Sequence, residues 1–401
     1  MKLRHVFLSM LFAIIAGSMT PIDSVFFELY NLVGKLFLNA LTLVVLPLVV
    51  SSIITGAIKL GQEKSVGKTA LVTFRSFYLT SFFSVIFALL VVALFSFEAA
   101  PFVAIDAESI QEITLFERLQ EILLSLFPSN LFATASQGKL LGLIGFSLLF
   151  GISTCKLKQN YRQVVSEFWQ GTFHVMMEMT MFIMKFLPIG VFGLIAKAVS
   201  ETGLSMIGPV LLFFTQAIIA QLLVLLVVIP ALLLMHRVSP VVFYRSILKP
   251  LMTAFTTSST AATLPVTLQS LEQAGLPNRI CSFALPLGTS MNLAGTAAYC
   301  AVAVPFLAST MGAELTFSTY LTIGVMSFFT SWGMVTGIPS ASLVIIIMIL
   351  QSIGITGGES AIALLLPVER FLDMIRTMTN VASNAACCQM VAAVEKKSVI
   401  V

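Results

Sequence analysis

Apolar runs about as long as a bilayer is thick recur along the whole 401-residue chain. A helix needs about 20 apolar residues to cross the hydrocarbon core of a membrane. Runs of this kind lie at 6–22, 34–58, 70–96, 139–155, 168–198 and 205–235. Charged residues make up 10% of the chain, against about 25% in soluble proteins. The sequence therefore predicts an all-α polytopic membrane protein that is surrounded by a lipid bilayer.

The charged residues between the runs predict the orientation of the chain. Lysines and arginines follow the second, fourth and sixth runs, whereas the connection 97–138 is rich in aspartate and glutamate. Basic connections tend to face the cytoplasm, so we expect 97–138 outside and both termini inside. Since most connections are short, the sequence favours a multi-pass protein of a bacterial cytoplasmic (inner) membrane. The net charge of +4 is too small and too dispersed to indicate a nucleic-acid partner.

Beyond residue 240 the apolar sequence is interrupted twice by polar and helix-breaking residues. The interruptions are the Ser/Thr-rich segment 256–265 and the segment 330–339, each with apolar sequence on both sides. We interpret each as the tip of a helical hairpin that enters the membrane and turns back. Backbone that is not helical at membrane depth needs protein or a water-filled cavity to satisfy its N–H and C=O groups. The two tips therefore indicate a shared polar site, although a kinked span or an external loop stays open for either segment alone.

A short repeat supports the pairing of the two interruptions. Each is followed by a related polar segment in an expected helix, 289–295 after the first and 377–383 after the second. The first hairpin would begin on the cytoplasmic side and the second on the outside, which makes the two units inverted repeats. Transporters commonly hold substrate and coupling ions between such repeats.

The last apolar run, 361–394, carries a stripe of polar and charged residues. Its members recur every three or four positions, which puts them on one helix face. They are Glu369, Asp373, Arg376, Thr377, Asn380 and Asn384. A charged residue at the centre of a membrane helix costs about 2.5–3.5 kcal/mol, so this face must meet a wet or paired interior.

The chemistry of the stripe indicates a site for an acidic amino acid. Arg376 can clamp a carboxylate through two parallel hydrogen bonds, and Asp373 can balance an ammonium group. The alternative is an internal salt-bridge set in which Asp373 or Glu369 neutralises Arg376.

Motifs in the second half of the chain resemble the dicarboxylate/amino acid:cation symporter family, which includes glutamate transporters and archaeal aspartate transporters. The matching segments are 263–267 (TLPVT), 285–288 (LPLG), 292–296 (NLAGT) and 373–381 (DMIRTMTNV). The resemblance covers nearly the whole chain. It implies eight transmembrane helices, two re-entrant helical hairpins in inverted repeats, a homotrimer, and an elevator-type movement of a transport domain against a scaffold.

The resemblance also implies how the chain divides between these two domains. Scaffold helices 1 and 2 would occupy 1–70, and helix 3 of the transport domain would occupy 70–96. The segment 97–235 would hold scaffold helices 4 and 5 with transport helix 6. The segment 240–398 would be the transport core of hairpin 1, helix 7, hairpin 2 and helix 8.

Residue by residue, the resemblance implies a substrate site on the last helix. Asp373 would bind the amino group of the substrate, Arg376 its side-chain carboxylate, and Thr377 and Asn380 its remaining polar groups. The presence of Asp373 favours aspartate or glutamate over dicarboxylates that lack an amino group.

The two hairpin tips would complete this implied site. Ser259 and Thr260 at the first tip would hold the backbone carboxylate, and Thr296 would lie against the substrate. Gly337, Ile338 and Pro339 at the second tip would close over it as a gate.

Two positions depart from the sodium-coupled pattern of the family, and both lack a carboxylate. Ala294 and Asn384 stand where sodium-coupled members have aspartates that coordinate sodium. Thr80, Ser81 and Asn292 match other ligand positions of one family sodium site. A cation at the membrane midplane needs oxygen ligands and preferably negative charge, because its desolvation costs several kcal/mol. We therefore do not expect coupling to three sodium ions.

Proton coupling is the natural substitute, and Glu369 is the leading candidate for the proton carrier because it is a carboxylate within reach of the expected site. A permanently ionised Glu369 paired with Arg370 or Arg376 is the alternative. Cys300 stands where proton-transporting glutamate carriers have a glutamate, so their counter-transport is not reproduced. Coupling to a single sodium ion and exchange without ion coupling stay open.

The sequence thus predicts a secondary active symporter of aspartate or glutamate that needs no cofactor. The alternatives are a C4-dicarboxylate or neutral amino acid carrier, a channel, and a transport-dead substrate sensor. An enzyme is not expected, because the sequence offers no nucleophile with an oriented base, metal-ligand cluster or phosphate-binding loop. The five cysteines lie in or beside apolar runs, which indicates packing residues rather than disulfides.

Overall fold

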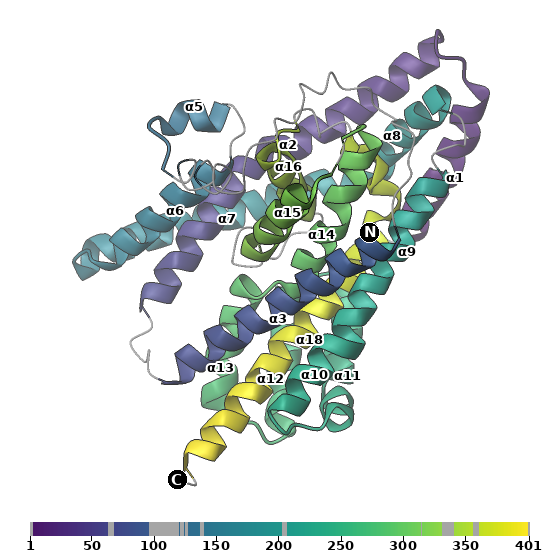
Figure 1. Cartoon of the computed structure of the whole chain (residues 1–401). Coiled ribbons are helices and arrows are strands. Elements are labelled where there is room, and N and C mark those ends of the chain that lie inside the picture. Colours follow the sequence, from purple (N-terminus) through teal and green to yellow (C-terminus); the bar gives the residue numbers. More distant parts are fainter. Residues whose placement is uncertain are drawn as a thin grey trace.

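The computed structural model describes residues 3–62, 68–95, 120, 124, 127–136, 140–202, 207–313, 315–330, 341–355 and 361–399. Within these residues every regular element is a helix, in agreement with the all-α prediction. The pairing of the helices divides the described chain into two groups (Figure 1).

The first group is built around the 38-residue helix α2 (Val25–Gln62). This helix packs along α6 (Leu140–Cys155), α7 (Gln159–Ile183) and α8 (Leu187–Thr202). Helix α1 (Leu3–Met19) packs along α8, and the short α5 (Leu131–Ser136) lies against α6.

Glycines bring the backbones of the first group close together. A Cβ atom at Gly193 of α8 would lie 2.7 Å from the carbonyl oxygen of Tyr30 on α2. A Cβ atom at Gly17 of α1 would lie 2.5 Å from the carbonyl oxygen of Ala196 on α8. Because a side chain at either position would meet backbone, the close packing of these three helices requires glycine there.

The second group surrounds α14 (Ala294–Thr310), which is buried along almost its whole length. The helices that pack against α14 are α3 (Lys68–Leu94), α9 (Ile207–Leu223), α15 (Phe317–Thr330), α16 (Ala341–Ser352) and α18 (Leu366–Val399). Helices α11 (Pro240–Thr257), α12 (Thr260–Gln273) and α13 (Asn278–Met291) pack against α18. Between the groups, α8 contacts α18 and the short 3-10 helix η3 (Ile362–Leu364).

Two of the expected apolar runs are not regular helices in the structure. The run 168–198 was expected to be one span, but α7 ends at Ile183 and α8 begins at Leu187 after the short η1 (Met184–Phe186), with a bend of 57°. Pro188 explains this break, since proline lacks an N–H group and its ring clashes with the carbonyl four residues earlier. The run 205–235 contains the π-helical segment η2 (Val224–Val228) between α9 and α10 (Ile229–Met235), where Pro230 disturbs the ladder in the same way.

By length and composition, three of the described helices could cross a membrane. They are Thr69–Leu94, Gly208–Met235 and the interrupted α13–α14 stretch Asn278–Thr310, and the bent pair α7 and α8 would add a fourth. The expected runs 34–58 and 139–155 correspond to the long α2 and to α6, in which the apolar stretches Leu46–Ile58 and Gly145–Cys155 are shorter.

The first interruption of the apolar pattern forms a helical hairpin. Helices α11 and α12 pack against each other, and the chain turns between them at Ser258 and Ser259. Ser258 has φ 51° and ψ 35°, a left-handed conformation that is uncommon for residues other than glycine. The Ser259 hydroxyl then accepts a hydrogen bond from the N–H of Ala262 and so caps α12.

The second interruption falls between α15 and α16, which also contact each other. Its tip, 331–340, with the expected gate residues Gly337, Ile338 and Pro339, lies outside the described residues.

The polar segment after the first hairpin differs from the expected continuous helix. The backbone leaves helical geometry at Asn292 (φ −138°, ψ 72°) and Leu293 (φ −96°, ψ 56°), so that α13 ends and α14 begins there. This break exposes the first N–H groups of α14, which have no partners within their own helix. It also turns the Asn292 side chain toward α3 and α18, where its hydrogen-bond partners lie.

Candidate functional site

The polar stripe of the last apolar run lies on α18 and is buried. Glu369, Asp373 and Arg376 are only 2%, 3% and 4% exposed, and Thr377, Asn380 and Asn384 are buried as well. Ion pairs and hydrogen bonds join Glu369, Asp373 and Arg376, with Arg370 beside them, into a charged cluster. A hydrogen bond joins Asn384 to Asn292 in an amide cluster. Asn380 bonds separately to the start of α14.

Both carboxylates of the charged cluster hold the Arg376 guanidinium. Its Nη1 and Nη2 each donate to Oε1 of Glu369 at 3.2 Å, and Nη2 also donates to Oδ1 of Asp373. Its Nη1 donates in addition to the Ser342 hydroxyl at 2.6 Å. The guanidinium carbon lies 4.8 Å from the centre of the Tyr299 ring, a cation–π distance. The internal salt-bridge arrangement that the sequence left as an alternative is thus the one present in this conformation.

The two carboxylates differ in what else surrounds them. Glu369 accepts hydrogen bonds from the Tyr299 hydroxyl at Oε2 and from the Ser342 hydroxyl at Oε1, the latter at 3.0 Å. Asp373 has its Oδ2 atom 3.6 Å from Nη1 of Arg370, whose side chain is 22% exposed. That Oδ2 atom is buried and has no hydrogen-bond partner within the described part of the chain. Asp373 therefore retains an acceptor position that Glu369 does not.

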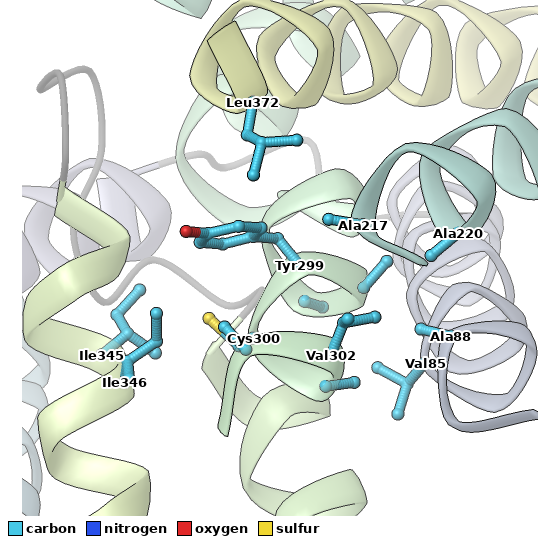
Figure 2. Close-up of a cluster of buried hydrophobic side chains, with 14 of the residues drawn as sticks. Val85, Ala88, Ala217, Ala220, Tyr299, Cys300, Val302, Ile345, Ile346 and Leu372 are labelled. Atoms are coloured by element: carbon cyan, nitrogen blue, oxygen red, sulfur yellow. The ribbon is translucent and has the colours of Figure 1, made fainter. Parts of the chain in front are cut away.

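Sequence reasoning missed Tyr299 and Ser342, which connect the charged cluster to α14 and α16. Figure 2 shows Tyr299 in an apolar cluster with Leu372 of α18, Ala217 of α9 and Ile345 of α16. The Tyr299 ring also packs against Phe213 at 6.1 Å between centroids. A bulky aromatic residue among the small residues of 294–304 was a usable signal for Tyr299. Ser342 carried no such signal.

Asn380 joins α18 to the start of α14. Its Oδ1 accepts from the backbone N–H groups of Gly295 at 2.8 Å and Thr296 at 3.3 Å, and its Nδ2 donates to the Thr296 hydroxyl at 3.2 Å. The structure thus brings the expected site residues Thr296 and Asn380 together, with their polar groups bonded to each other. Thr377 donates its hydroxyl to the Asp373 carbonyl in its own helix.

The residues expected at a cation site meet around Asn292. The Asn292 Oδ1 accepts from Thr80 at 3.0 Å and from Ser81 at 3.3 Å, and its Nδ2 donates to Oδ1 of Asn384 at 3.0 Å. Sequence reasoning missed two further partners of that Nδ2, Ser383 at 2.9 Å and Cys387 at 3.5 Å. Asn292 therefore presents its oxygen to Thr80 and Ser81. Toward α18 it presents an amide N–H₂, which is a hydrogen-bond donor where a cation would need oxygen atoms.

The tip of the first hairpin lies beside α18. Phe255 of α11 packs edge-to-face on Phe371 of α18, with 6.1 Å between ring centroids. Among the expected tip residues, Ser259 uses its hydroxyl to cap α12, and Thr260 is buried. Ser258, which sequence reasoning did not select, has a buried hydroxyl with no hydrogen-bond partner in the residues that the structure describes. A buried hydroxyl without a hydrogen-bond partner costs free energy. The tip of the first hairpin thus keeps one polar group, the Ser258 hydroxyl, that could still form a hydrogen bond.

Comparison with known proteins identifies the family. The model of the Sodium:dicarboxylate symporter family matches residues 3–394, almost the whole chain. The chain belongs to this family. Because the family consists of membrane transporters, the protein is a symporter and not an enzyme.

Several relatives in this symporter family have names that state a substrate. A proton/sodium-glutamate symport protein of Bacillus subtilis is 29% identical over 88% of this chain and 83% of its own length. A proton/glutamate-aspartate symporter of Escherichia coli is 28% identical over 91% of this chain and 85% of its own. The human excitatory amino acid transporter 1 is 37% identical over a shorter stretch, 61% of this chain and 45% of its own length.

Proposed function

We propose that this protein is a secondary active symporter of an acidic amino acid, aspartate or glutamate, in the cytoplasmic membrane. The observation that carries the proposal is the buried charged cluster on α18, which combines a guanidinium with an Asp373 oxygen that accepts no hydrogen bond within the described residues. The relatives named for glutamate and aspartate support the same substrate class. A substrate with one ammonium and two carboxylates offers a group of opposite charge to both the guanidinium and Asp373.

In this proposal the substrate replaces protein groups that now hold Arg376. Its side-chain carboxylate takes the guanidinium from Glu369 and Asp373, and its ammonium group binds the freed oxygens of Asp373. Thr377, Asn380 and Thr296 contact the rest of the substrate. The first tip, with Ser259, Thr260 and the unpaired hydroxyl of Ser258, holds the backbone carboxylate, and the second tip, with Gly337, Ile338 and Pro339, closes the site.

We further propose that coupling does not use three sodium ions and that a proton is the coupling ion. The amide group of Asn292 supports this. Its Oδ1 already accepts from the Thr80 and Ser81 hydroxyls, and its N–H₂ donates to Oδ1 of Asn384, so the oxygens that a cation would use are engaged in hydrogen bonds. Ala294 adds no ligand atom. The names of the relatives are consistent with either proton or sodium coupling.

The division of the helices supports an elevator mechanism. We propose that α3 and the helices from α9 to α18 form a transport domain, and that α1, α2, α6, α7 and α8 form a scaffold at the centre of a homotrimer. The contacts of α8 with α18 and η3 would then lie at the sliding interface. Eight full spans, two re-entrant hairpins and cytoplasmic termini complete this proposed topology.

Uptake by purified protein in liposomes tests the substrate. We expect saturable uptake of labelled aspartate that unlabelled glutamate inhibits and that succinate and serine do not. Arg376→Lys should weaken aspartate affinity by about tenfold or more, since lysine keeps the charge but loses the paired hydrogen bonds. Arg279→Lys is the matched control, because Arg279 is 78% exposed and pairs with Glu395. Saturable uptake of succinate in place of aspartate would overturn the proposal.

The same liposomes test the coupling when sodium and proton gradients are imposed separately. We expect an inward proton gradient to drive accumulation of aspartate. Stimulation by a sodium gradient alone would contradict proton coupling.

A further inference from the structure

The charged cluster on α18 is electrically neutral before any substrate binds. It contains the carboxylates of Glu369 and Asp373 and the guanidinium groups of Arg370 and Arg376. An acidic amino acid carries two carboxylates and one ammonium group, so it brings a net charge of −1 into this buried place. An uncompensated charge in such surroundings is strongly unfavourable. One positive charge must therefore enter with the substrate.

Competition for Arg376 decides where that charge is needed. Glu369 and Asp373 both pair with Arg376 in this conformation. A substrate carboxylate that takes both Nη atoms of Arg376 must displace these pairings. Asp373 then still has Arg370 at 3.6 Å and gains the substrate ammonium group. Among the residues that the structure describes, Glu369 then keeps only the neutral hydroxyls of Tyr299 and Ser342 as partners.

We propose that Glu369 carries the coupling proton, and that it binds this proton when the substrate carboxylate displaces it from Arg376. This inference rests on the proposed function and on the sequence-based candidate Glu369, to which it adds the trigger for protonation and the number of protons. A proton from the solution that the substrate leaves forms an O–H bond on one Glu369 oxygen. The bond breaks on the other side of the membrane, when the substrate departs and Arg376 pairs with Glu369 again. Binding takes up one proton per substrate and adds no net charge.

The surroundings of Glu369 are suited to both protonation states. The Tyr299 and Ser342 hydroxyls donate to the ionised carboxylate now, and each can rotate to accept a hydrogen bond from the protonated one. Within the described part of the chain, the titratable groups that face Glu369 are Tyr299 and Cys300 on α14 and Asp373 and Arg376 on α18. The packed segment of α16 contributes Ser342 and no titratable side chain.

Calorimetric titration of the full-length protein with aspartate, in buffers of different ionisation enthalpy, measures the protons that binding takes up. We expect uptake of one proton in the wild type, and an affinity that falls about tenfold for each unit of rising pH, the slope for one linked proton. Glu369→Gln imitates the protonated carboxyl, so this variant should bind aspartate with no proton uptake and no such slope. Glu395→Gln, the same change further along α18, should retain both.

In liposomes, Glu369→Gln should exchange aspartate across the membrane, but an inward proton gradient should no longer drive aspartate accumulation. Glu369→Asp retains an ionisable group and should retain proton uptake, which gives a second variant if the glutamine variant does not fold. Wild-type protein that binds aspartate without a proton, or a folded Glu369→Gln that still takes up one, would overturn the inference. Wild-type protein that binds no aspartate at any pH would instead refute the proposed function.

Discussion

Asn380 offers a test of whether α18 stabilises the N-terminal end of α14 through hydrogen bonds or only faces the substrate. In Asn380→Ala, the backbone N–H of Gly295 loses its 2.8 Å acceptor, the N–H of Thr296 loses a weaker one at 3.3 Å, and the Thr296 hydroxyl loses a donor. Asn380 is 4% exposed, so water does not readily replace it. One orphaned buried N–H costs about 1–3 kcal/mol, and the cavity adds to it. We expect a loss of about 2–4 kcal/mol in unfolding free energy.

Asn380→Asp separates the two roles of this side chain. Its carboxylate can still accept from both backbone N–H groups, and the N-terminal end of α14 favours a negative charge. A buried charge is itself unfavourable, so we expect the unfolding free energy of Asn380→Asp to approach the wild-type value as the pH falls and its carboxyl is protonated, while its charge at neutral pH weakens binding of an acidic substrate.

The assay is denaturant unfolding of detergent-solubilised protein, compared with aspartate binding to the same samples. Asn278→Ala is the matched control, since the exposed Asn278 side chain donates across the turn to Glu272. We expect its effect to stay within about 0.5 kcal/mol. An Asn380→Ala variant as stable as the wild type would refute the capping role, and with it the view that α18 determines where α14 begins.

Three further changes probe other parts of the molecule. Gly17→Ala should destabilise the packing of α1 on α8 by about 1–3 kcal/mol, because its Cβ would lie 2.5 Å from a backbone oxygen; Gly171→Ala, with open space around it, is the control, and equal thermal unfolding of the two would contradict this. Ser342→Ala should cost about 1–3 kcal/mol in denaturant unfolding, since this hydroxyl bonds both Arg376 and Glu369; an unchanged midpoint would count against the charged cluster as described. Asn384→Asp buries a carboxylate next to Asn292. The melting temperature of this variant should therefore rise with added sodium or with falling pH. A response equal to that of the wild type would contradict the interpretation of the amide cluster.

Local pattern was enough to predict several features of the fold. The Ser/Thr-rich segment 256–265 contains the turn between α11 and α12 at Ser258 and Ser259. The three- and four-residue spacing of the stripe correctly put Glu369, Asp373 and Arg376 on one buried helix face. Each of these features depends on residues close together in the chain, where helix periodicity and turn chemistry act directly.

Other features depended on contacts between distant segments. Pro188 was visible in the sequence, but the 57° bend between α7 and α8 also depends on how both helices pack along α2. The break at Asn292 was missed because the amide finds its partners on α3 and α18, which are far away in the sequence. Side-chain partners on other helices help to offset the backbone hydrogen bonds that are lost where a helix breaks. The residues next to the break in the sequence do not indicate which partners these will be.

The sequence by itself determined that this is an all-helical membrane protein with an arginine and two carboxylates on one face of its last helix. It also determined that positions 294 and 384 carry an alanine and an asparagine and therefore no carboxylate. Only the tertiary structure decided that both carboxylates hold Arg376, that Tyr299 and Ser342 support Glu369, and that an amide occupies the centre of the second cluster. The physical reason is that helix periodicity selects a face, whereas the partners of each buried polar group depend on which side chains of other helices pack against it.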